Sequence, residues 1–337
     1  MTQVDSTTRL TEAELTRLVA GLLGAHGVEP LTADALARVI VAAERDGTLS
    51  HGLARLPGYL SSLQSGWVDG AARMTVTDKA AAVVHVDAAN GFAQGALARA
   101  SELAIAKARA AGLCLVSIHD SHHFGSLWPD VEPFAERGLV CMAFVNSRSR
   151  IVAPGARRPV LGTNPVAFAF PRKDGAPVVW DLASSVMAHG DVILAAKNGH
   201  PLPAGAGVDR EARPTQDPKR VLDGGALVPF AGHKGFAIAL MAEVMVAGLT
   251  GSRFGFEDES GKYPGAVTSN AGQTLVLIDP NRSGGGDFIG RVELLIGALR
   301  EAGTERLPAD RRYRNRAVAA AEGIAVDRAM LDLLKTG

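Results

Sequence analysis

Residues 181–191 bring a dense group of chemically versatile side chains together. The stretch reads Asp-Leu-Ala-Ser-Ser-Val-Met-Ala-His-Gly-Asp and follows a short β-like run at 177–180. His189 and Asp191 flank Gly190, and a glycine lets the backbone turn sharply or a ligand approach closely. Far upstream, Ser50 and His51 are adjacent and can pass a proton between them. We predict that these two segments form one chemical centre.

Other kinds of chemistry fit these residues less well. His122 and His123 are adjacent, so in an extended segment they point to opposite sides, and no metal site is predicted. Ser50, His51 and Asp191 resemble a nucleophilic triad, but the sequence contains no Gly-x-Ser-x-Gly turn. The same three residues can instead relay a proton without a covalent step.

Several positively charged residues are candidates for holding anions. Arg55 lies four residues after His51, and a guanidinium suits a carboxylate through paired, charge-assisted hydrogen bonds. His233 and Lys234 lie at the expected start of a helix, where free N–H groups favour anions. Arg311 and Arg312 follow a Leu-Pro pair. No Gly-x-Gly-x-x-Gly occurs, so a Rossmann domain is not expected.

Composition indicates a globular protein that does not bind nucleic acid. The 337 residues are 47% hydrophobic and 21% charged, which are ordinary globular values. Basic and acidic residues number 35 each, so charge gives no reason to expect nucleic acid or an anionic membrane as partner. No signal-peptide pattern and no membrane-length apolar run occur. Cys114 and Cys141 lie in apolar runs and are expected to be buried thiols, and a cytoplasmic location is predicted.

The elements that must position these residues fall into three predicted regions. Residues 1–75 are expected to be helical, beginning with a capping box at Thr11, and residues 76–300 to form an α/β region that binds cofactor and substrate. Residues 301–337 are expected to add a helix that packs on the first region, with a single helix predicted from Arg316 to Leu334.

Three further expectations concern loops and a helix. His119–Gly125 is predicted to be a polar loop, and 197–225 a long loop rich in Gly, Pro and Asp. Lys234–Leu249 is predicted to be an apolar helix covered on most sides.

Five ordered motifs, which span nearly the whole chain, resemble the type-2 malate/L-lactate dehydrogenase family. They are Asp46–Arg55, Ser121–Gly125, Leu161–Pro165, Trp180–Ser184 and Gly232–Gly235. The resemblance implies an unusual nicotinamide-binding α/β fold that is not a Rossmann domain, a homodimer, and a site between domains near the subunit interface.

Within this family the chain is most similar to the Δ1-piperideine-2-carboxylate/Δ1-pyrroline-2-carboxylate reductases. The supporting stretches are 56–63, 127–134, 188–191 and 307–313, with Ala309 where glycine is expected. The hydroxy-acid branch tends to carry Gly-Lys where this chain has His189-Gly190-Asp191. The resemblance therefore implies NADPH-dependent reduction of a cyclic imino acid to L-pipecolate or L-proline.

The resemblance also assigns residues to roles. Ser50, His51 and Asp191 would relay the proton, with His123 an alternative, and Arg55, Thr163, His189 and Gly190 would contact substrate. The predicted cofactor contacts are Asp120, Ser121, His122, His123, Phe124, Asp181, Leu182, Ala183, His233, Lys234, Pro308, Ala309, Asp310, Arg311, Arg312, Tyr313 and Arg314.

Two other functions stay open at this point. One is an NAD(P)-dependent dehydrogenase of a 2-hydroxy acid such as malate, lactate or ureidoglycolate on the same fold, and the other is a non-catalytic binding protein. NADH as the cofactor, the ring size of the imine and the pathway also stay open.

Overall fold

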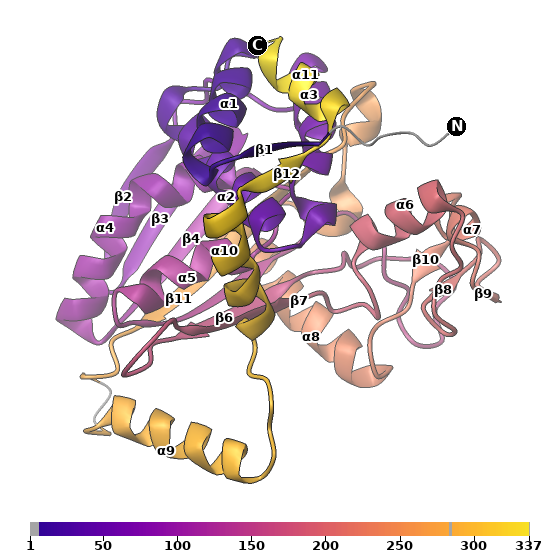
Figure 1. Ribbon diagram of the computed structural model, residues 1–337. Helices are drawn as coiled ribbons and strands as arrows, with labels where there is room; N and C mark the ends of the chain where they lie inside the picture. The colour runs from indigo at the N-terminus through magenta and orange to yellow at the C-terminus, as the bar shows by residue number, and fades with distance from the viewer. Residues whose placement is uncertain (1–6, 283–284, 337) are drawn as a thin grey trace.

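A seven-stranded mixed sheet forms the centre of the computed structural model, which describes residues 7–282 and 285–336 (Figure 1). β3 and β4 pair in parallel, whereas the other neighbouring strands pair antiparallel. A Rossmann domain needs a mainly parallel sheet, so the predicted mixed, non-Rossmann α/β fold is confirmed. The order across the sheet is β2 (Thr75–Ala80), β3 (Val83–Phe92), β4 (Leu113–His123), β11 (Ser269–Ile278), β5 (Val140–Val145), β6 (Val166–Phe170) and β7 (Val178–Leu182).

The central strands β4 and β11 are longer than the apolar segments of their sequences. The prediction of a loop from His119 is wrong, because β4 continues to His123 and pairs there with Ser269 of β11. The polar residues in this part of β11 are buried and do not face solvent. Hydrophobic patterning does not reveal such strands. His123 is therefore the last residue of β4, where pairing with β11 fixes its backbone.

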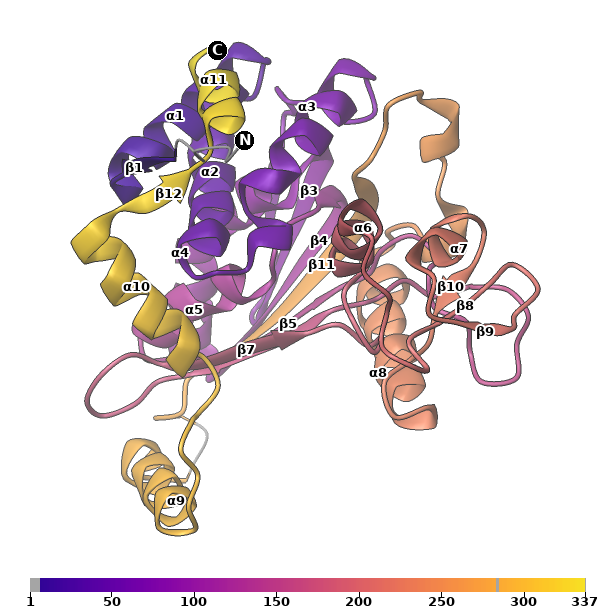
Figure 2. The same cartoon turned by 45° about the vertical axis from the view of Figure 1, so that its right-hand side comes forward.

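Helices cover both faces of the sheet. α4 (Ala93–Ala111) and α5 (Trp128–Glu136) pack on one face and form the main hydrophobic core with β3, β4 and β5. α8 (His233–Glu243) lies on the other face, where Ala242 packs with Phe144 of β5. Figure 2 shows α5 and α8 on opposite sides of the sheet.

Segments from both chain ends form a helical layer. Its members are α1 (Glu12–Ala25), α2 (Pro30–Arg45), α3 (Leu56–Gln64) and α11 (Arg328–Lys335), which share a second hydrophobic core. The capping box at Thr11 is confirmed, since its hydroxyl accepts from Glu14 N and the Glu14 carboxylate accepts from Thr11 N. The division into 1–75, 76–300 and 301–337 stays a prediction, and residues 1–6 lie outside the described residues.

The prediction of one helix from Arg316 to Leu334 is wrong. α10 (Asp310–Glu322) ends at Gly323, whose φ of 78° is a left-handed value that stops a helix. The chain then forms β12 (Ile324–Val326), which pairs antiparallel with β1 (Thr8–Leu10), before α11 begins. This pairing joins the two ends of the described chain.

A small lobe follows β7 in the chain and lies beside the main sheet (Figure 1). The prediction of a long loop over 197–225 is wrong, because this part holds short strands and a helix. The strands form a three-stranded sheet in the order β10, β8, β9. The lobe consists of α6 (His189–Asn198), β8 (Gly207–Val208), β9 (Pro214–Thr215), α7 (Pro218–Leu222) and β10 (Ala226–Leu227).

α8 begins where the sequence predicts, but the described residues leave part of it exposed, so the prediction that it is covered on most sides is wrong. It continues into a π-helical turn at Val244–Gly248. Four large apolar residues on this helix and its continuation are 40% to 56% exposed, namely Leu240, Met241, Val244 and Leu249. α9 (Phe288–Glu301) stands beyond the sheet edge, below the other elements in Figure 1. Among the described residues, no helix has the length and apolar character needed to cross a membrane.

Candidate active site

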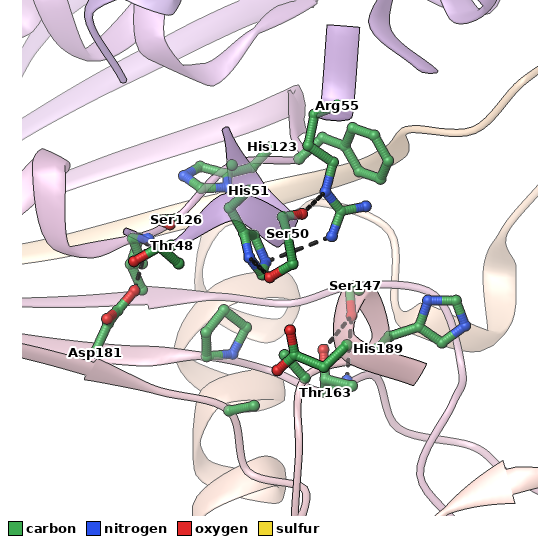
Figure 3. A pocket seen from close by; sticks show the side chains of 18 of the residues that line it. Thr48, Ser50, His51, Arg55, His123, Ser126, Ser147, Thr163, Asp181 and His189 are labelled. Atoms are coloured by element: carbon green, nitrogen blue, oxygen red, sulfur yellow. Dashed lines mark hydrogen bonds between the residues drawn. The ribbon is translucent and has the colours of Figure 1, made fainter. Parts of the chain in front are cut away.

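A cavity of about 480 Å³ lies where the helical layer, the sheet and the small lobe meet. It brings together every predicted catalytic and substrate-binding residue: Ser50, His51, Arg55, Thr163, His189, Gly190 and Asp191. Figure 3 shows Ser50, His51 and Arg55 on one side and Ser147, Thr163 and His189 on the other. Residues far apart in sequence therefore line one cavity.

Ser50, His51 and Arg55 lie on two consecutive 3₁₀ turns, Leu49–His51 and Leu53–Arg55. The Ser50 Oγ and His51 Nδ1 are 3.0 Å apart, and the Arg55 Nη2 makes a longer contact of 3.5 Å with His51 Nε2. Because a guanidinium only donates, this contact favours the tautomer with the proton on Nδ1. His51 can then donate to Ser50, whose own hydrogen is free to point into the cavity.

Burial controls the charge of His51. It lowers the pKa of His51 to about 3, with smaller effects from Arg55 and His123. His51 is therefore neutral near pH 7, and it can take part in proton transfer only as a relay that gains a proton at one nitrogen and releases it at the other.

In the part of the chain that the structure describes, Arg55 forms no ion pair with a carboxylate. Its Nε donates to the Ser50 carbonyl at 2.7 Å, and its guanidinium carbon lies 4.2 Å from the centre of the Phe124 ring. Burial lowers the pKa of Arg55, while the Tyr59 hydroxyl and Asp191 act in the opposite direction. The remaining donors of this fixed guanidinium are suited to a substrate carboxylate.

Gly190 gives Arg55 the space that it needs. A Cβ at this position would lie 2.5 Å from Arg55 Nη2 and 3.3 Å from the Ser50 carbonyl oxygen. Both atoms belong to the site, so any side chain at residue 190 must displace the guanidinium.

Gly190→Ala is expected to raise the KM for the carboxylate substrate at least tenfold, with a smaller change in the KM for the nicotinamide cofactor. The control is Gly24→Ala in α1, where an added Cβ meets no atom within 4 Å. Steady-state kinetics with each substrate varied in turn measure both values. Normal kinetics for Gly190→Ala would show that Arg55 does not need this space.

His123 forms a second proton-handling pair in the cavity wall. Its Nε2 lies 2.9 Å from Asp130 Oδ2, and both side chains are 2% exposed. Gln273 Nε2 donates to the same carboxylate oxygen at 2.6 Å. An ionised carboxylate accepts, so Nε2 carries the proton and Nδ1 is the remaining nitrogen. This geometry allows His123, like His51, to handle the proton of the reaction, so His123 stays an alternative for that role.

Asp191 lines the cavity at the start of α6, but no described residue hydrogen-bonds to its carboxylate. The structure therefore joins Ser50 to His51 directly, and Asp191 acts on Arg55 only through its charge. A role for Asp191 in the relay stays a prediction.

Arg150 is a cavity residue that sequence reasoning missed. Its Nη1 lies 2.6 Å from His189 Nε2, which must accept because the guanidinium can only donate. Burial, with the charges of Arg150, Arg55 and Arg148, lowers the pKa of His189 to about 2. His189 is thus neutral and offers an N–H only at Nδ1. No spacing signal marks Arg150, which follows a strand end as one basic residue among several.

Thr163 is positioned by a buried polar network beneath the cavity. Its backbone N donates to Ser147 Oγ at 3.2 Å, and Ser147 N donates to Asn164 Oδ1 at 3.2 Å. Asn164 and Asn146 both donate to the carboxylate of Glu243, the last residue of α8. Glu243 is only 3% exposed. A buried carboxylate with several donors fixes its neighbours, and this network therefore ties the Thr163 wall to α8.

The predicted cofactor residues divide into two groups. His123, Phe124, Asp181, Leu182, Ala183 and Arg311 line the cavity. Asp181 Oδ2 accepts from the backbone N–H groups of Leu127 and Trp128 at the start of α5, and Arg312 lies 3.7 Å from Oδ1. Burial raises the pKa of Asp181, and the Arg312 charge and these hydrogen bonds oppose that effect.

The other predicted cofactor residues lie outside the cavity lining, and their roles stay predictions. His233 and Lys234 are exposed at the start of α8. Pro308, Ala309 and Arg312 line a neighbouring hollow that shares Arg311 with the cavity. Asp310 accepts from Leu307 N, Tyr313 donates to Glu132 and to the Pro177 carbonyl, and Arg314 is exposed.

Asp120, Ser121 and His122 are engaged with the sheet. Asp120 accepts from Asn270, and the Ser121 hydroxyl donates to the Ala271 carbonyl. His122 is 0% exposed, with Nδ1 2.9 Å from Thr268 Oγ1 and Nε2 2.8 Å from Asn90 Oδ1. A direct contact between His122 and a cofactor would require these bonds to break.

His122 gives the fold a specific pH dependence. Burial, and then the charges of Arg148 and Arg253, lower its pKa from 6.5 to about 3. Below about pH 6.5 His122 binds a proton in the unfolded chain but stays neutral in the folded protein. The free energy of unfolding therefore falls on acidification. We expect this residue to contribute a loss of roughly 2 kcal/mol at pH 5.

Urea denaturation at pH 7.5 and pH 5 measures this contribution in the wild type and in His122→Gln. The variant should lose less stability between the two pH values than the wild type does. The same loss in both proteins would contradict the assignment.

The described residues contain no group of three or more His, Cys, Asp or Glu side chains that could hold a metal ion. The sequence expectation of a site without a metal is not tested by this observation alone. The cavity chemistry described above uses hydroxyl, imidazole, carboxylate and guanidinium groups.

Comparison with known proteins places this geometry in context. The sequence model of the malate/L-lactate dehydrogenase family matches residues 10–335. A Pseudomonas syringae pv. tomato protein named Δ1-pyrroline-2-carboxylate/Δ1-piperideine-2-carboxylate reductase is 54% identical over 96% of this chain and 94% of its own. A Chromohalobacter salexigens protein named (2R)-3-sulfolactate dehydrogenase (NADP⁺) is 43% identical over 97% of this chain and 96% of its own.

Solved structures are similar over the whole fold. The crystal structure of Δ1-piperideine-2-carboxylate reductase from Pseudomonas syringae pv. tomato matches with a TM-score of 0.96 and 53% identity, covering 98% of this chain and 99% of that one. A dehydrogenase from Sinorhizobium meliloti matches with a TM-score of 0.87 and 31% identity, covering 98% of both chains.

Proposed function

Because the chain belongs to the malate/L-lactate dehydrogenase family, we propose that it is an NADPH-dependent reductase of cyclic imino acids. Its substrates would be Δ1-piperideine-2-carboxylate, reduced to L-pipecolate, and Δ1-pyrroline-2-carboxylate, reduced to L-proline. The 54% identity to a reductase of this name, over nearly the full length of both chains, supports the proposal.

The observation that carries the proposal is the charge pattern around His189-Gly190-Asp191. Arg55 lies against Gly190 and can hold the substrate carboxylate, while Asp191 adds a negative charge to the same cavity. A protonated imine is a better hydride acceptor than a neutral one, and a nearby carboxylate stabilises its charge. A 2-oxo acid carries no such positive charge and would benefit less.

The chain's own residues would orient the substrate and supply the proton. Arg55, Thr163 and the Nδ1–H of neutral His189 can bind the carboxylate. Ser50 can deliver a proton to the imine nitrogen, while His51 releases one to Ser50 from Nδ1 and takes one up at Nε2 from solvent that enters the cavity. The bound nicotinamide supplies the hydride to the carbon that carries the carboxylate.

An extended dinucleotide would lie along the cavity and its neighbouring hollow. They share Arg311, which forms no ion pair within the described residues, and Arg306 lines the hollow beside it. Arg312 is already engaged with the Val179 carbonyl and the Trp128 ring. We therefore assign a 2′-phosphate to Arg311 rather than to Arg312, which favours NADPH over NADH.

A homodimer in the cytoplasm belongs to the same proposal. The exposed apolar residues of α8 and its continuation form a face suited to a second copy of the chain. Glu243 on this helix reaches the network under Thr163, so such an interface would stabilise the substrate wall. The two cysteines are free and buried, which fits a reducing compartment.

The direct test is NADPH oxidation by the purified protein in the presence of each imine, with chiral analysis of the product. We expect turnover of both imines, formation of the L-amino acid, and a lower KM for NADPH than for NADH. Absence of turnover with both imines and both cofactors would overturn the proposed function.

A further inference from the structure

Arg150 presents a positive charge to the cavity from a rigid backbone. Its N–H donates to the Leu161 carbonyl at 2.8 Å, and its own carbonyl accepts from Leu227 N at 2.8 Å. Ile151 next to it forms bridges to Leu161 and Leu227. The chain is thus fixed on both sides of Arg150, and the side chain is aimed at the cavity from a defined position.

Within the described residues, Arg150 forms no ion pair with a carboxylate. Its one side-chain hydrogen bond goes to neutral His189, which leaves most of its five donors unused. The negative charge that acts on the pKa of Arg150 is that of Asp258, whose carboxylate lies 3.8 Å from Arg148 and accepts from the Ser260 hydroxyl. Burial and the Arg148 charge lower the pKa of Arg150 to about 10, which reflects the cost of an uncompensated charge. An anionic ligand would offset this cost.

Arg55 and Arg150 are tied to neighbouring residues of one turn. Gly190 lies against the Arg55 guanidinium, and His189 binds that of Arg150. The Cα atoms of consecutive residues are about 3.8 Å apart, so both guanidiniums border the same small region of the cavity. This arrangement is more than a single carboxylate requires, and two acid groups on one small ring can meet one guanidinium each.

We propose that Arg150 forms a second anion-binding position, which lets the cavity accept cyclic imino acids bearing a second carboxylate beside the one on the C=N carbon. This inference rests on the proposed function. An example is Δ1-piperideine-2,6-dicarboxylate, in which the two acid groups flank the ring nitrogen. Hydride adds to C2 and a proton to nitrogen, giving piperidine-2,6-dicarboxylate, while NADPH becomes NADP⁺ and the second carboxylate is unchanged.

Binding of stable aromatic analogues tests this position without turnover. Pyridine-2-carboxylate and pyridine-2,6-dicarboxylate are planar, differ by one carboxylate and accept no hydride from the enzyme. Calorimetric titration of the NADPH-loaded protein at pH 7.5, in metal-free buffer, gives a dissociation constant for each. We expect the wild type to bind the dicarboxylate at least tenfold more tightly.

Variants then locate the effect. Arg150→Met keeps the apolar stem and should abolish the preference, whereas Arg150→Lys keeps the charge and should retain part of it. Arg38→Met is the matched control, because Arg38 lies on α2 outside the cavity lining and its side chain is 72% exposed. It should leave both constants unchanged. Thermal unfolding of each variant reports whether the fold is intact.

Two outcomes would overturn the inference. Equal binding of both analogues by the wild type would show that no second position exists. An equal loss of affinity for both analogues in Arg150→Met and Arg150→Lys would show that Arg150 serves only the shared carboxylate, through His189. A protein that prefers the dicarboxylate but reduces no imine would refute the proposed function and leave the binding position standing.

Discussion

Replacing Arg55 with methionine is expected to raise the KM for Δ1-piperideine-2-carboxylate about a hundredfold and to change the KM for NADPH less than threefold. The hundredfold effect corresponds to about 2.8 kcal/mol, which is within the range for losing a charge-assisted hydrogen bond in a partly buried site. The Ser50 carbonyl and the Phe124 ring fix the guanidinium, so the substrate meets an ordered group. The loss should therefore be large.

Arg38→Met is the matched control for this charge change. Arg38 lies on α2 with its side chain 72% exposed and pairs with Asp34. Its kinetic constants should equal those of the wild type, because exposed pairs contribute little. If Arg55→Met raises both KM values by the same factor, Arg55 does not contact the substrate carboxylate directly.

Replacing His51 with glutamine is expected to lower kcat about a hundredfold or more while leaving both KM values near the wild type. Glutamine keeps a hydrogen-bonding group near Ser50 but cannot gain a proton at one atom and release it at another. Since burial holds the pKa of His51 at about 3, kcat of the wild type should show no His51 titration between pH 5 and pH 9.

The comparison variant is His123→Gln, which removes the imidazole that pairs with Asp130. We expect it to lower kcat less than His51→Gln does. A larger loss in His123→Gln, with His51→Gln close to normal, would move the proton-handling role to the His123–Asp130 pair.

Residue types and spacing were sufficient to predict which residues would gather around one cavity, whereas their chemical roles stay predictions. Ser50, His51, Arg55 and the His189-Gly190-Asp191 turn lie far apart in sequence, and the structure places all of them around one cavity. Glycine between two polar residues indicated a close approach, and Gly190 meets the Arg55 guanidinium. The missing glycine fingerprint also correctly excluded a parallel Rossmann sheet.

Features that depend on long-range pairing could not be predicted. The outer half of β11 contains buried polar residues whose partners come from other strands, so its hydrophobic pattern gives no strand signal. The break at Gly323 creates β12 only because β1, more than 300 residues earlier in the chain, is there to pair with it. Arg150 was missed for the same reason, since its partner His189 is 39 positions away.

The helix at 234–249 shows a different limit. Its apolar sequence predicted a helix covered on most sides, and this prediction is wrong within the described residues, because Leu240, Met241 and Val244 are exposed. A sequence pattern does not distinguish a face covered by the same chain from one covered by a second copy.

The central claim is that the Asp191 carboxylate adapts this cavity to a protonated imine. The most direct measurement is kcat/KM for Δ1-piperideine-2-carboxylate and for pyruvate, with NADPH, in the wild type and in Asp191→Asn. We expect the wild type to prefer the imine at least a hundredfold, and Asp191→Asn to lose at least tenfold with the imine while changing little with pyruvate. A wild type that reduces pyruvate as efficiently as the imine, or an Asp191→Asn variant with normal imine reduction, would contradict the account.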